Sequence, residues 1–335
     1  SKNMCTSISY TNQVHFFGRN LDLEIDYPIS VVITPRNYEF KFRDTDDLKS
    51  HYAMIGVGIV EANYPLYFDG CNEKGLGMAG LAFFGMAQYN DVKEGKTNLA
   101  SFEFMPYILG KCASVEEAKK ELENINITKE NFAPQMPASE LHWIIADKTS
   151  AITVEITAEK GMVVYDNPYG VMTNCPDFEY QSTNLSYYVN LSGGLVPIRF
   201  APDPVGLKEY SRGTGTIGLP GGTDSVSRFV RTAFTKMNST LKKGIENETD
   251  YYNNVSEFFH ILSNVQQVSG ESEVKPGEYE LTQYTDCIDT DHGILYYNTY
   301  FNPSINAVDM NKENLDGSEI IAYKGVKTFQ TNWQN

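Results

Sequence analysis

The sequence predicts an α+β fold in which helices cover β-sheets, and three observations support this. Apolar runs of strand length lie near both ends of the 335-residue chain, whereas helical spacing is concentrated in the middle. Apolar residues make up 41% of the chain, with 22 Tyr and 18 Phe, so a large core can form. Because sheets and helices bury their apolar faces against one another, layers are expected.

The first predicted element is a β-hairpin. Residues 5–10 alternate between apolar and polar types, Asn12 and Gln13 are typical of a turn, and residues 14–17 continue as a strand. Further strands are predicted at residues 29–34, 51–60, 75–84, 143–146, 151–156, 161–165, 279–285, 293–300 and 305–309.

Four helices are predicted. Residues 101–112 have helical spacing, and Ser114 with Glu117 forms a capping box that opens a helix to about Glu123. Residues 223–237 carry capping residues at their start and apolar residues at helical spacing. Residues 255–265 form the fourth candidate.

Segment 188–222 is rich in Gly and Pro and is longer than an ordinary loop. We expect it to protrude as an interaction arm. No internal repeat and no shift in composition marks a domain boundary, so residues 5–335 are expected to form one domain.

Charge and hydropathy exclude several classes of protein. The net charge of −16 disfavours nucleic acid and anionic membrane surfaces as partners. The chain contains no run of 18 apolar residues, so no membrane helix is predicted. No secretory signal is visible either, so a cytoplasmic location is expected. The five cysteines are widely spaced, which favours reduced thiols that are mostly buried.

Common cofactor and catalytic motifs are weak or missing. Residues 75–80 and 213–218 match the Gly-x-Gly-x-x-Gly pattern, but the first lies in a strand-like run and the second ends at Pro220. No His-Glu-x-x-His pair or Gly-x-Ser-x-Gly elbow occurs, so neither a metal nor another cofactor is expected. His142 is interpreted as a hydrogen-bonded core residue, while a Cys–His protease pair remains open.

Cys5 is the strongest candidate nucleophile. Met4 has the context of an initiator and residues 1–3 that of a cloning remnant, with a short propeptide as the alternative. Removal of Met4 would give Cys5 a free α-amine, which has a pKa of about 8 in model peptides and can act as the base for the thiol. The competing interpretation is that Cys5 is only the first buried residue of a strand.

Residues 4–6 (Met-Cys-Thr) and 17–22 (Phe-Gly-Arg-Asn-Leu-Asp) resemble the start of the choloylglycine hydrolase family. This family contains bile salt hydrolases and penicillin V acylases and belongs to the N-terminal nucleophile (Ntn) hydrolases. The resemblance covers essentially the whole chain, and it continues through residues 34–37, 64–67, 72–77, 141–143, 166–168, 172–174, 218–221, 227–229, 258–262 and 309–315.

The resemblance implies a four-layer αββα sandwich of two antiparallel sheets between helical layers. It also implies that Cys5 attacks, that Arg19 lies beside the thiol, and that Asp22 holds the α-amine. Asn174 would donate to the oxyanion, and Arg228 would complete the polar cluster. Taken without the resemblance, Arg19 and Asp22 could form a surface ion pair, Asn174 could be a turn residue, and Arg228 could be a solvated helix residue.

One position departs from the family pattern. Bile salt hydrolases usually carry Asn, and penicillin V acylases Tyr, where this chain has Ala82. Since the family uses the backbone N–H here for the oxyanion, Ala82 is expected to preserve catalysis. The side chain that commonly separates the two activities is missing.

The resemblance also implies a substrate pocket and an assembly. The pocket candidates are Leu21, Phe68, Phe132 and Met136, with ordinary core or loop packing as the alternative. The arm implies a homotetramer in which Arg212 meets the anionic end of the conjugate.

The expected function is hydrolysis of glycine- or taurine-conjugated bile acids by an enzyme of a gut bacterium. Penicillin V acylase activity is the nearest alternative. A catalytically silent protein that binds bile acids is the alternative from another class.

Overall fold

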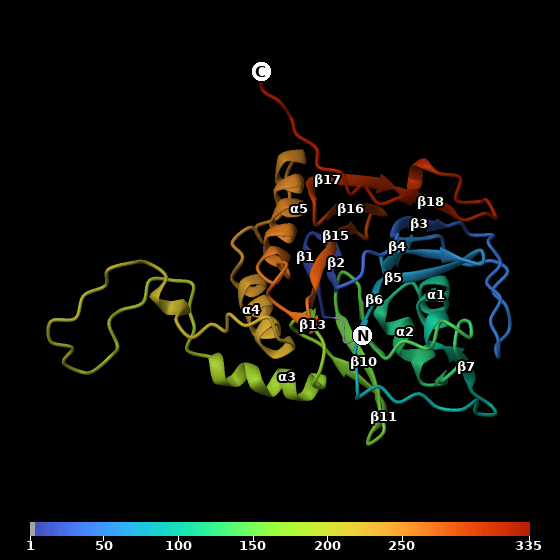
Figure 1. Cartoon of the computed structure of the whole chain (residues 1–335), viewed down its shortest axis with the longest axis horizontal. Coiled ribbons are helices and arrows are strands. Elements are labelled where there is room, and N and C mark those ends of the chain that lie inside the picture. Colours follow the sequence, from blue (N-terminus) through green and yellow to red (C-terminus); the bar gives the residue numbers. More distant parts are fainter. Residues whose placement is uncertain (1–3) are drawn as a thin grey trace.

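The computed structural model describes residues 4–335, and its body is built on two large antiparallel sheets (Figure 1). The six-stranded sheet has the order β12 (Val171–Met172), β1 (Met4–Asn12), β2 (Val14–Leu23), β15 (Leu281–Asp289), β16 (Ile294–Thr299) and β17 (Asn302–Asp309). The eight-stranded sheet has the order β11 (Gly161–Asp166), β10 (Ala151–Thr157), β9 (Leu141–Ala146), β6 (Gly77–Ala82), β5 (Tyr64–Asn72), β4 (Met54–Glu61), β3 (Ser30–Thr34) and β18 (Ile321–Lys324).

Helices lie on the outer sides of the sheets (Figure 1). On the side of the eight-stranded sheet are α1 (Ser101–Lys111) and α2 (Val115–Leu122), and on the other side are α3 (Phe178–Leu185), α4 (Ser225–Asn238) and α5 (Glu248–Ser263). The smaller elements are the parallel pair β7 (Thr97–Ala100) and β8 (Ile125–Thr128), the pair β13 (Glu273–Lys275) and β14 (Glu278–Tyr279), and the 3₁₀ turns η1 (Ser186–Tyr188), η2 (Thr214–Thr216) and η3 (Met310–Lys312).

Three separate apolar cores fill the spaces between the layers. In the first, Phe104 of α1 packs edge-on against Trp143 of β9, with 4.8 Å between ring centroids. In the second, Ile55 and Ile288 come from different sheets and meet between them. In the third, Phe258 of α5 packs on the six-stranded sheet. The predicted four-layer αββα sandwich is therefore confirmed.

The predicted first hairpin is confirmed, but its second strand is longer than expected. Strand β2 continues to Leu23 rather than ending at residue 17, and all of its residues are buried. Its polar residues Arg19, Asn20 and Asp22 interrupt the apolar pattern, yet hydrogen bonds allow them to be buried. The second half of this central strand was therefore not predicted, because its sequence is polar.

The helix predictions were correct in place and differ at the ends. Ser114 caps α2 and accepts a hydrogen bond from the Glu117 N–H, which is one of the two bonds of the predicted capping box. Helix α4 begins after the cap Asp224, and α5 begins at Glu248 rather than at residue 255 because Asn247 caps it. Strands β5, β7, β8, β12, β13 and β18 and helix α3 had no predicted counterpart.

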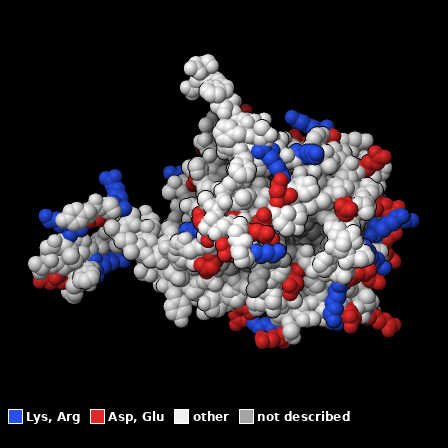
Figure 2. Space-filling model, viewed as in Figure 1, with Lys and Arg blue, Asp and Glu red and all other residues white. Residues whose placement is uncertain are grey.

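Between η1 and α4 the chain leaves the body as a long loop (Figure 1). In residues 189–224 the only regular element is η2. Large apolar side chains on this loop face solvent, including Leu195, Phe200 and Tyr210, which are 88%, 85% and 90% exposed. Basic side chains also gather on it (Figure 2). Among residues 4–335, no helix combines the length and hydrophobicity that a membrane crossing requires.

Candidate active site around Cys5

The sheet topology brings the five predicted polar residues together. Cys5 lies on β1 beside Leu21 of β2, and Asp22 lies one position further along the same pair. Strand β12 pairs with the other edge of β1, so Asn174, just after β12, reaches the same region. Arg228 lies on α4, which packs over β1. Residues far apart in the chain therefore converge on the start of β1.

Arg228 ties helix α4 to this strand. Its Nη1 donates to the Cys5 carbonyl oxygen (2.6 Å) and to Thr6 Oγ1 (2.8 Å), and its Nη2 donates to Asn174 Oδ1 (2.7 Å). The side chain is completely buried, and burial lowers the pKa of Arg228 from its ordinary value. Because a buried cation requires compensation, Asp22 is its principal electrostatic partner. Arg228 is thus a structural and electrostatic part of the cluster and not a solvated helix residue.

Asn174 lies between Cys5 and Ala82. Its Oδ1 accepts from the Cys5 N–H (3.0 Å), and its Nδ2 donates to the Ala82 carbonyl oxygen (2.8 Å). In a β-strand the N–H and C=O of one residue point to the same side, so the Ala82 N–H also faces this region. An amide Nδ2 has two hydrogens, which leaves one for an oxyanion. The two predicted oxyanion donors therefore lie side by side.

Arg19 is held by carbonyl groups of the opposite sheet. Its Nη1 donates to Phe68 O (2.8 Å) and Gly80 O (2.6 Å), and the side chain is 1% exposed. A β-bulge between β4 and β5 falls at Phe68, because Asp69 and Tyr67 pair with consecutive residues of β4. Such bulges re-aim backbone groups, and this one directs a carbonyl at the guanidinium.

Burial is the largest influence on the pKa of the Cys5 thiol, and charges of both signs act on it as well. Cys5 is 2% exposed, and burial raises its pKa, whereas the positive charges of Arg19 and Arg228 lower it. The Asp22 charge raises this pKa, and a hydrogen bond from the Asp22 backbone lowers it. With Met4 attached, the Cys5 nitrogen is an amide and cannot accept the thiol proton. The cluster therefore holds a buried thiol and two buried cations, and in this form it has no free α-amine beside the thiol.

Two buried carboxyl groups surround the backbone nitrogens at the start of β1. Asp22 Oδ1 accepts from Thr282 Oγ1 (2.7 Å), and Glu280 Oε1 accepts from the Met4 N–H (3.1 Å). Asp22 Oδ2 and Glu280 Oε2 are buried without a hydrogen-bond partner within residues 4–335. Burial raises the pKa of Asp22 to about 6, and burial together with Asp22 raises that of Glu280 to about 8. Unpaired carboxylate oxygens at this position suit an ammonium group.

Sequence reasoning missed Glu280 and Thr282. Both lie near the start of β15, in a stretch recognised only as a strand. A bulge at Gln283 shifts the pairing of β15 with β2, so Thr282 opposes Asp22 while Tyr284 opposes Leu21. No local sequence pattern predicts this shift in pairing.

The raised pKa of Glu280 predicts a pH dependence of stability. The folded chain holds the Glu280 proton more tightly than the unfolded chain, so this group stabilises the fold at low pH and loses that contribution as the pH rises through about 8. Glu280→Gln should remove this dependence. As the pH rises from about 6 to about 10, the unfolding free energy of the variant should therefore increase relative to that of the parent chain. Urea unfolding of both proteins at these two pH values measures the unfolding free energies. Glu273→Gln, at an exposed glutamate, is the control, and equal pH dependence of the two variants would refute the prediction.

The structure separates the predicted pocket residues into two groups. Leu21 and Phe68 belong to the same inter-sheet core as Cys5. Phe132 packs instead on Phe102, with 5.1 Å between ring centroids, and its N–H donates to the carbonyl oxygen of Met136. The loop that holds Phe132 and Met136 is thus not in that core.

The other predicted features lie outside the cluster around Cys5. Arg212 is exposed on the protruding loop. His142 is 1% exposed and is hydrogen-bonded to Glu155 Oε2 (2.8 Å) and Thr173 O (2.9 Å), which confirms its prediction as a core residue. Residues 75–80, the first match to the Gly-x-Gly-x-x-Gly pattern, lie in a turn and in strand β6. Among residues 4–335, no three His, Cys, Asp or Glu side chains are arranged to hold a metal ion.

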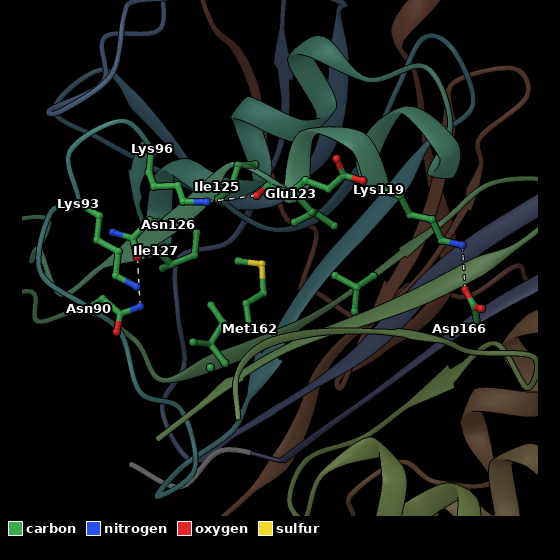
Figure 3. Close-up of a pocket in the computed structure, with 14 residues that line it drawn as sticks. Asn90, Lys93, Lys96, Lys119, Glu123, Ile125, Asn126, Ile127, Met162 and Asp166 are labelled. Atoms are coloured by element: carbon green, nitrogen blue, oxygen red, sulfur yellow. Dashed lines mark hydrogen bonds and ion pairs between the residues drawn. The ribbon is translucent and has the colours of Figure 1, made fainter. Parts of the chain in front are cut away.

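A surface pocket of about 620 Å³ lies in another part of the fold (Figure 3). Lysines line its rim, but Lys119 pairs with Asp166 (2.9 Å) and Lys96 donates to the Glu123 carbonyl oxygen (3.4 Å). None of the described residues that line it is Cys, Ser, Thr or His. This pocket and the Cys5 cluster are therefore lined by different residues.

Residues 5–323 match the family of linear amide C–N hydrolases called the choloylglycine hydrolase family. The chain belongs to the choloylglycine hydrolase family. It is 47% identical over 320 residues to the bile salt hydrolase/transferase of Lactiplantibacillus plantarum, with 96% of each chain covered. It is 42% identical to the bile salt hydrolase/transferase of Clostridium perfringens, which covers 99% of this chain and 100% of that protein.

Structural similarity agrees with this membership. A crystal structure of a variant of conjugated bile acid hydrolase from Clostridium perfringens matches 99% of this chain and 100% of its own, with a TM-score of 0.90 and 40% identity. The match extends across both sheets, so this member of the choloylglycine hydrolase family has the Ntn-hydrolase fold and is a linear amide C–N hydrolase.

Proposed function

We propose that this enzyme is a bile salt hydrolase that cleaves the amide bond of glycine- or taurine-conjugated bile acids. The observation that carries the proposal is the buried thiol of Cys5, which shares one cluster with Arg19, Asp22, Asn174 and Arg228. The names of its relatives from Lactiplantibacillus plantarum and Clostridium perfringens support bile salts as the substrates.

Catalysis would begin when the residues before Cys5 are removed. The new α-amine takes the thiol proton, and the sulfur attacks the amide carbonyl carbon. Asp22 and Glu280 have unpaired oxygens that suit the resulting ammonium group. Cys5 is 2% exposed with Met4 in place, and we expect removal of the preceding residues to open the thiol to substrate.

The oxyanion would be stabilised by Asn174 Nδ2 and the Ala82 N–H, which lie beside each other. Taurine or glycine then leaves after the ammonium group protonates its nitrogen, and water releases the bile acid from the Cys5 thioester. The steroid would lie against Leu21 and Phe68, the two pocket candidates in the core that contains Cys5. Phe132 and Met136 would form a more distant wall.

Side-by-side turnover of taurocholate, glycocholate and penicillin V tests the proposal, using protein whose intact mass shows Cys5 at the N-terminus. We expect both bile salts to be cleaved faster than penicillin V. Preference for penicillin V would assign the enzyme to acylase chemistry, for which the small Ala82 side chain leaves room. Tight binding of taurocholate without turnover would instead favour a silent binding protein.

We further propose that residues 188–222 are an assembly arm of a cytoplasmic, bacterial homotetramer. Isolated apolar side chains such as Leu195, Phe200 and Tyr210 on a protruding loop would be covered by a neighbouring subunit. Arg212, exposed on the same loop, would then meet the anionic end of the conjugate at a neighbour's site.

Two variants separate these roles. Phe200→Ser with Tyr210→Ser should lower the molar mass measured by light scattering, because it removes apolar interface area. Arg212→Ala should keep the mass and lower the taurocholate-to-glycocholate ratio of kcat/KM. An unchanged mass in the first variant would remove the arm proposal, and an unchanged ratio in the second would remove the role of Arg212. Cell fractionation checks the location.

A further inference from the structure

Two buried carboxyl groups lie behind Arg19, outside the cluster described above. Asp69 of β5 and Asp286 of β15 belong to different sheets, and both are 0% exposed. Alternation along each strand directs both into the inter-sheet core, since Cys71 on β5 and Ile288 on β15, each two residues further on, lie in that core. Two ionised carboxylates at this depth would repel each other strongly.

The contacts of this pair leave one oxygen of each group unexplained. Tyr284 Oη donates to Asp69 Oδ1 (2.5 Å), and the Arg19 N–H donates to Asp286 Oδ1 (2.9 Å). Asp69 Oδ2 and Asp286 Oδ2 are buried and have no hydrogen-bond donor within residues 4–335. Each of the two carboxyl groups is also a leading electrostatic influence on the other. Two carboxyl groups can hydrogen-bond to each other only when one of them carries a proton.

We propose that Asp69 and Asp286 share one proton and act as a positioning pair for the Arg19 guanidinium. The pair then carries one negative charge, which balances the one positive charge of Arg19 in the interior. Buried ions are stable only when they are paired and hydrogen-bonded, and the shared proton meets both conditions.

The pair also fixes Arg19 geometrically. Asp286 accepts from the Arg19 backbone, while Phe68, which precedes Asp69, offers its carbonyl oxygen to the Arg19 side chain. Arg19 is in turn the largest electrostatic influence that lowers the pKa of Cys5. The proposal rests on the proposed function, because it assigns the pair to the cation that stabilises the Cys5 thiolate.

Burial favours one retained proton on the pair. It raises the pKa of Asp286 well above its ordinary value and raises that of Asp69 as well. The charge of each carboxylate would also oppose ionisation of the other. The pair as a unit therefore keeps one proton and one negative charge.

Amide substitutions test this assignment through activity. In Asp286→Asn, the amide donates to Asp69 as the acid proton did, and the negative charge remains, so kcat and KM for taurocholate should stay close to those of the parent enzyme. The double variant Asp69→Asn with Asp286→Asn loses the charge and should lower kcat roughly 10- to 100-fold with little change in KM. Asp289→Asn, at another completely buried carboxylate of β15, is the control for packing damage.

Infrared spectroscopy tests it without substrate. Two proteins are compared at mildly alkaline pH, and both carry Glu280→Gln. The parent of this pair, which keeps Asp286, should show the carbonyl stretch of a protonated, buried carboxylic acid. The protein that also carries Asp286→Asn should lack this band. The absence of that band from the parent would overturn the proposal. A folded Asp286→Asn variant as inactive as the double variant would also overturn it. Since the band requires no turnover, its presence would uphold the pair even if the enzyme with Glu280 intact and Cys5 at its N-terminus failed to cleave taurocholate, and that failure would refute the proposed function alone.

Discussion

Cys5→Ala is expected to lower kcat for taurocholate by about 10⁴-fold or more, since no other group can form the thioester. The structure supports so large an effect because Cys5 is the cysteine that lies against Arg19 and Arg228, the two buried cations of the cluster. Turnover should be measured on protein whose mass confirms that residue 5 is N-terminal. Alanine is small, so processing before this position should be preserved.

Two controls make the loss interpretable. Cys112→Ala removes another buried thiol, which lies in the core under α1 and α2, and should leave kcat unchanged. Thermal unfolding should show that Cys5→Ala remains folded, since the deleted sulfur atom is small. Persistent turnover by a folded Cys5→Ala protein would show that another residue is the nucleophile.

Asn174→Asp is expected to lower kcat about 10²- to 10³-fold, which is the usual cost of removing one oxyanion donor. The substitution keeps Oδ1 available to the Cys5 N–H and Arg228 Nη2, as observed for asparagine. It replaces the Nδ2 donor beside Ala82 by an oxygen that repels the oxyanion. The effect therefore reports the donor and not the support of Cys5.

Asn167→Ala is the matched control, because Asn167 is a buried amide just before β12 that donates to the Val171 carbonyl oxygen. It should reduce the unfolding free energy by about 1–3 kcal/mol through unpaired backbone groups and leave kcat near the parent value. Equal losses of kcat in Asn167→Ala and Asn174→Asp would mean that both residues only support the fold. KM should change little in either variant.

Local patterns predicted those parts of the fold that depend on local chemistry. The turn at Gln13 and the cap at Ser114 were predicted because each depends on neighbouring residues. Strand β2 was predicted too short because its buried polar side chains have partners far along the chain, such as Thr285 for Asn20. Asn247 shows that even a good cap is overlooked when the turns after it are polar.

The candidate site divides in the same way. Cys5 was identified from its position after Met4 and from resemblance to a family, and Arg19 and Asp22 from the resemblance alone; the structure brings the three together. Glu280 and the pair of Asp69 and Asp286 were missed, because bulges at Phe68 and Gln283 set their positions and such shifts arise from pairing between distant strands. Burial then changes their protonation, which no sequence motif records.

The most direct test of the central claim compares two preparations of this chain whose intact masses differ only at the N-terminus. One begins at Cys5, and the other retains Met4 and the residues before it. We predict rapid taurocholate turnover by the first and at least about 100-fold slower turnover by the second, because an amide nitrogen cannot accept the thiol proton. Equal rates, with the masses unchanged after the assay, would contradict catalysis by a cysteine that uses its own α-amine as the base.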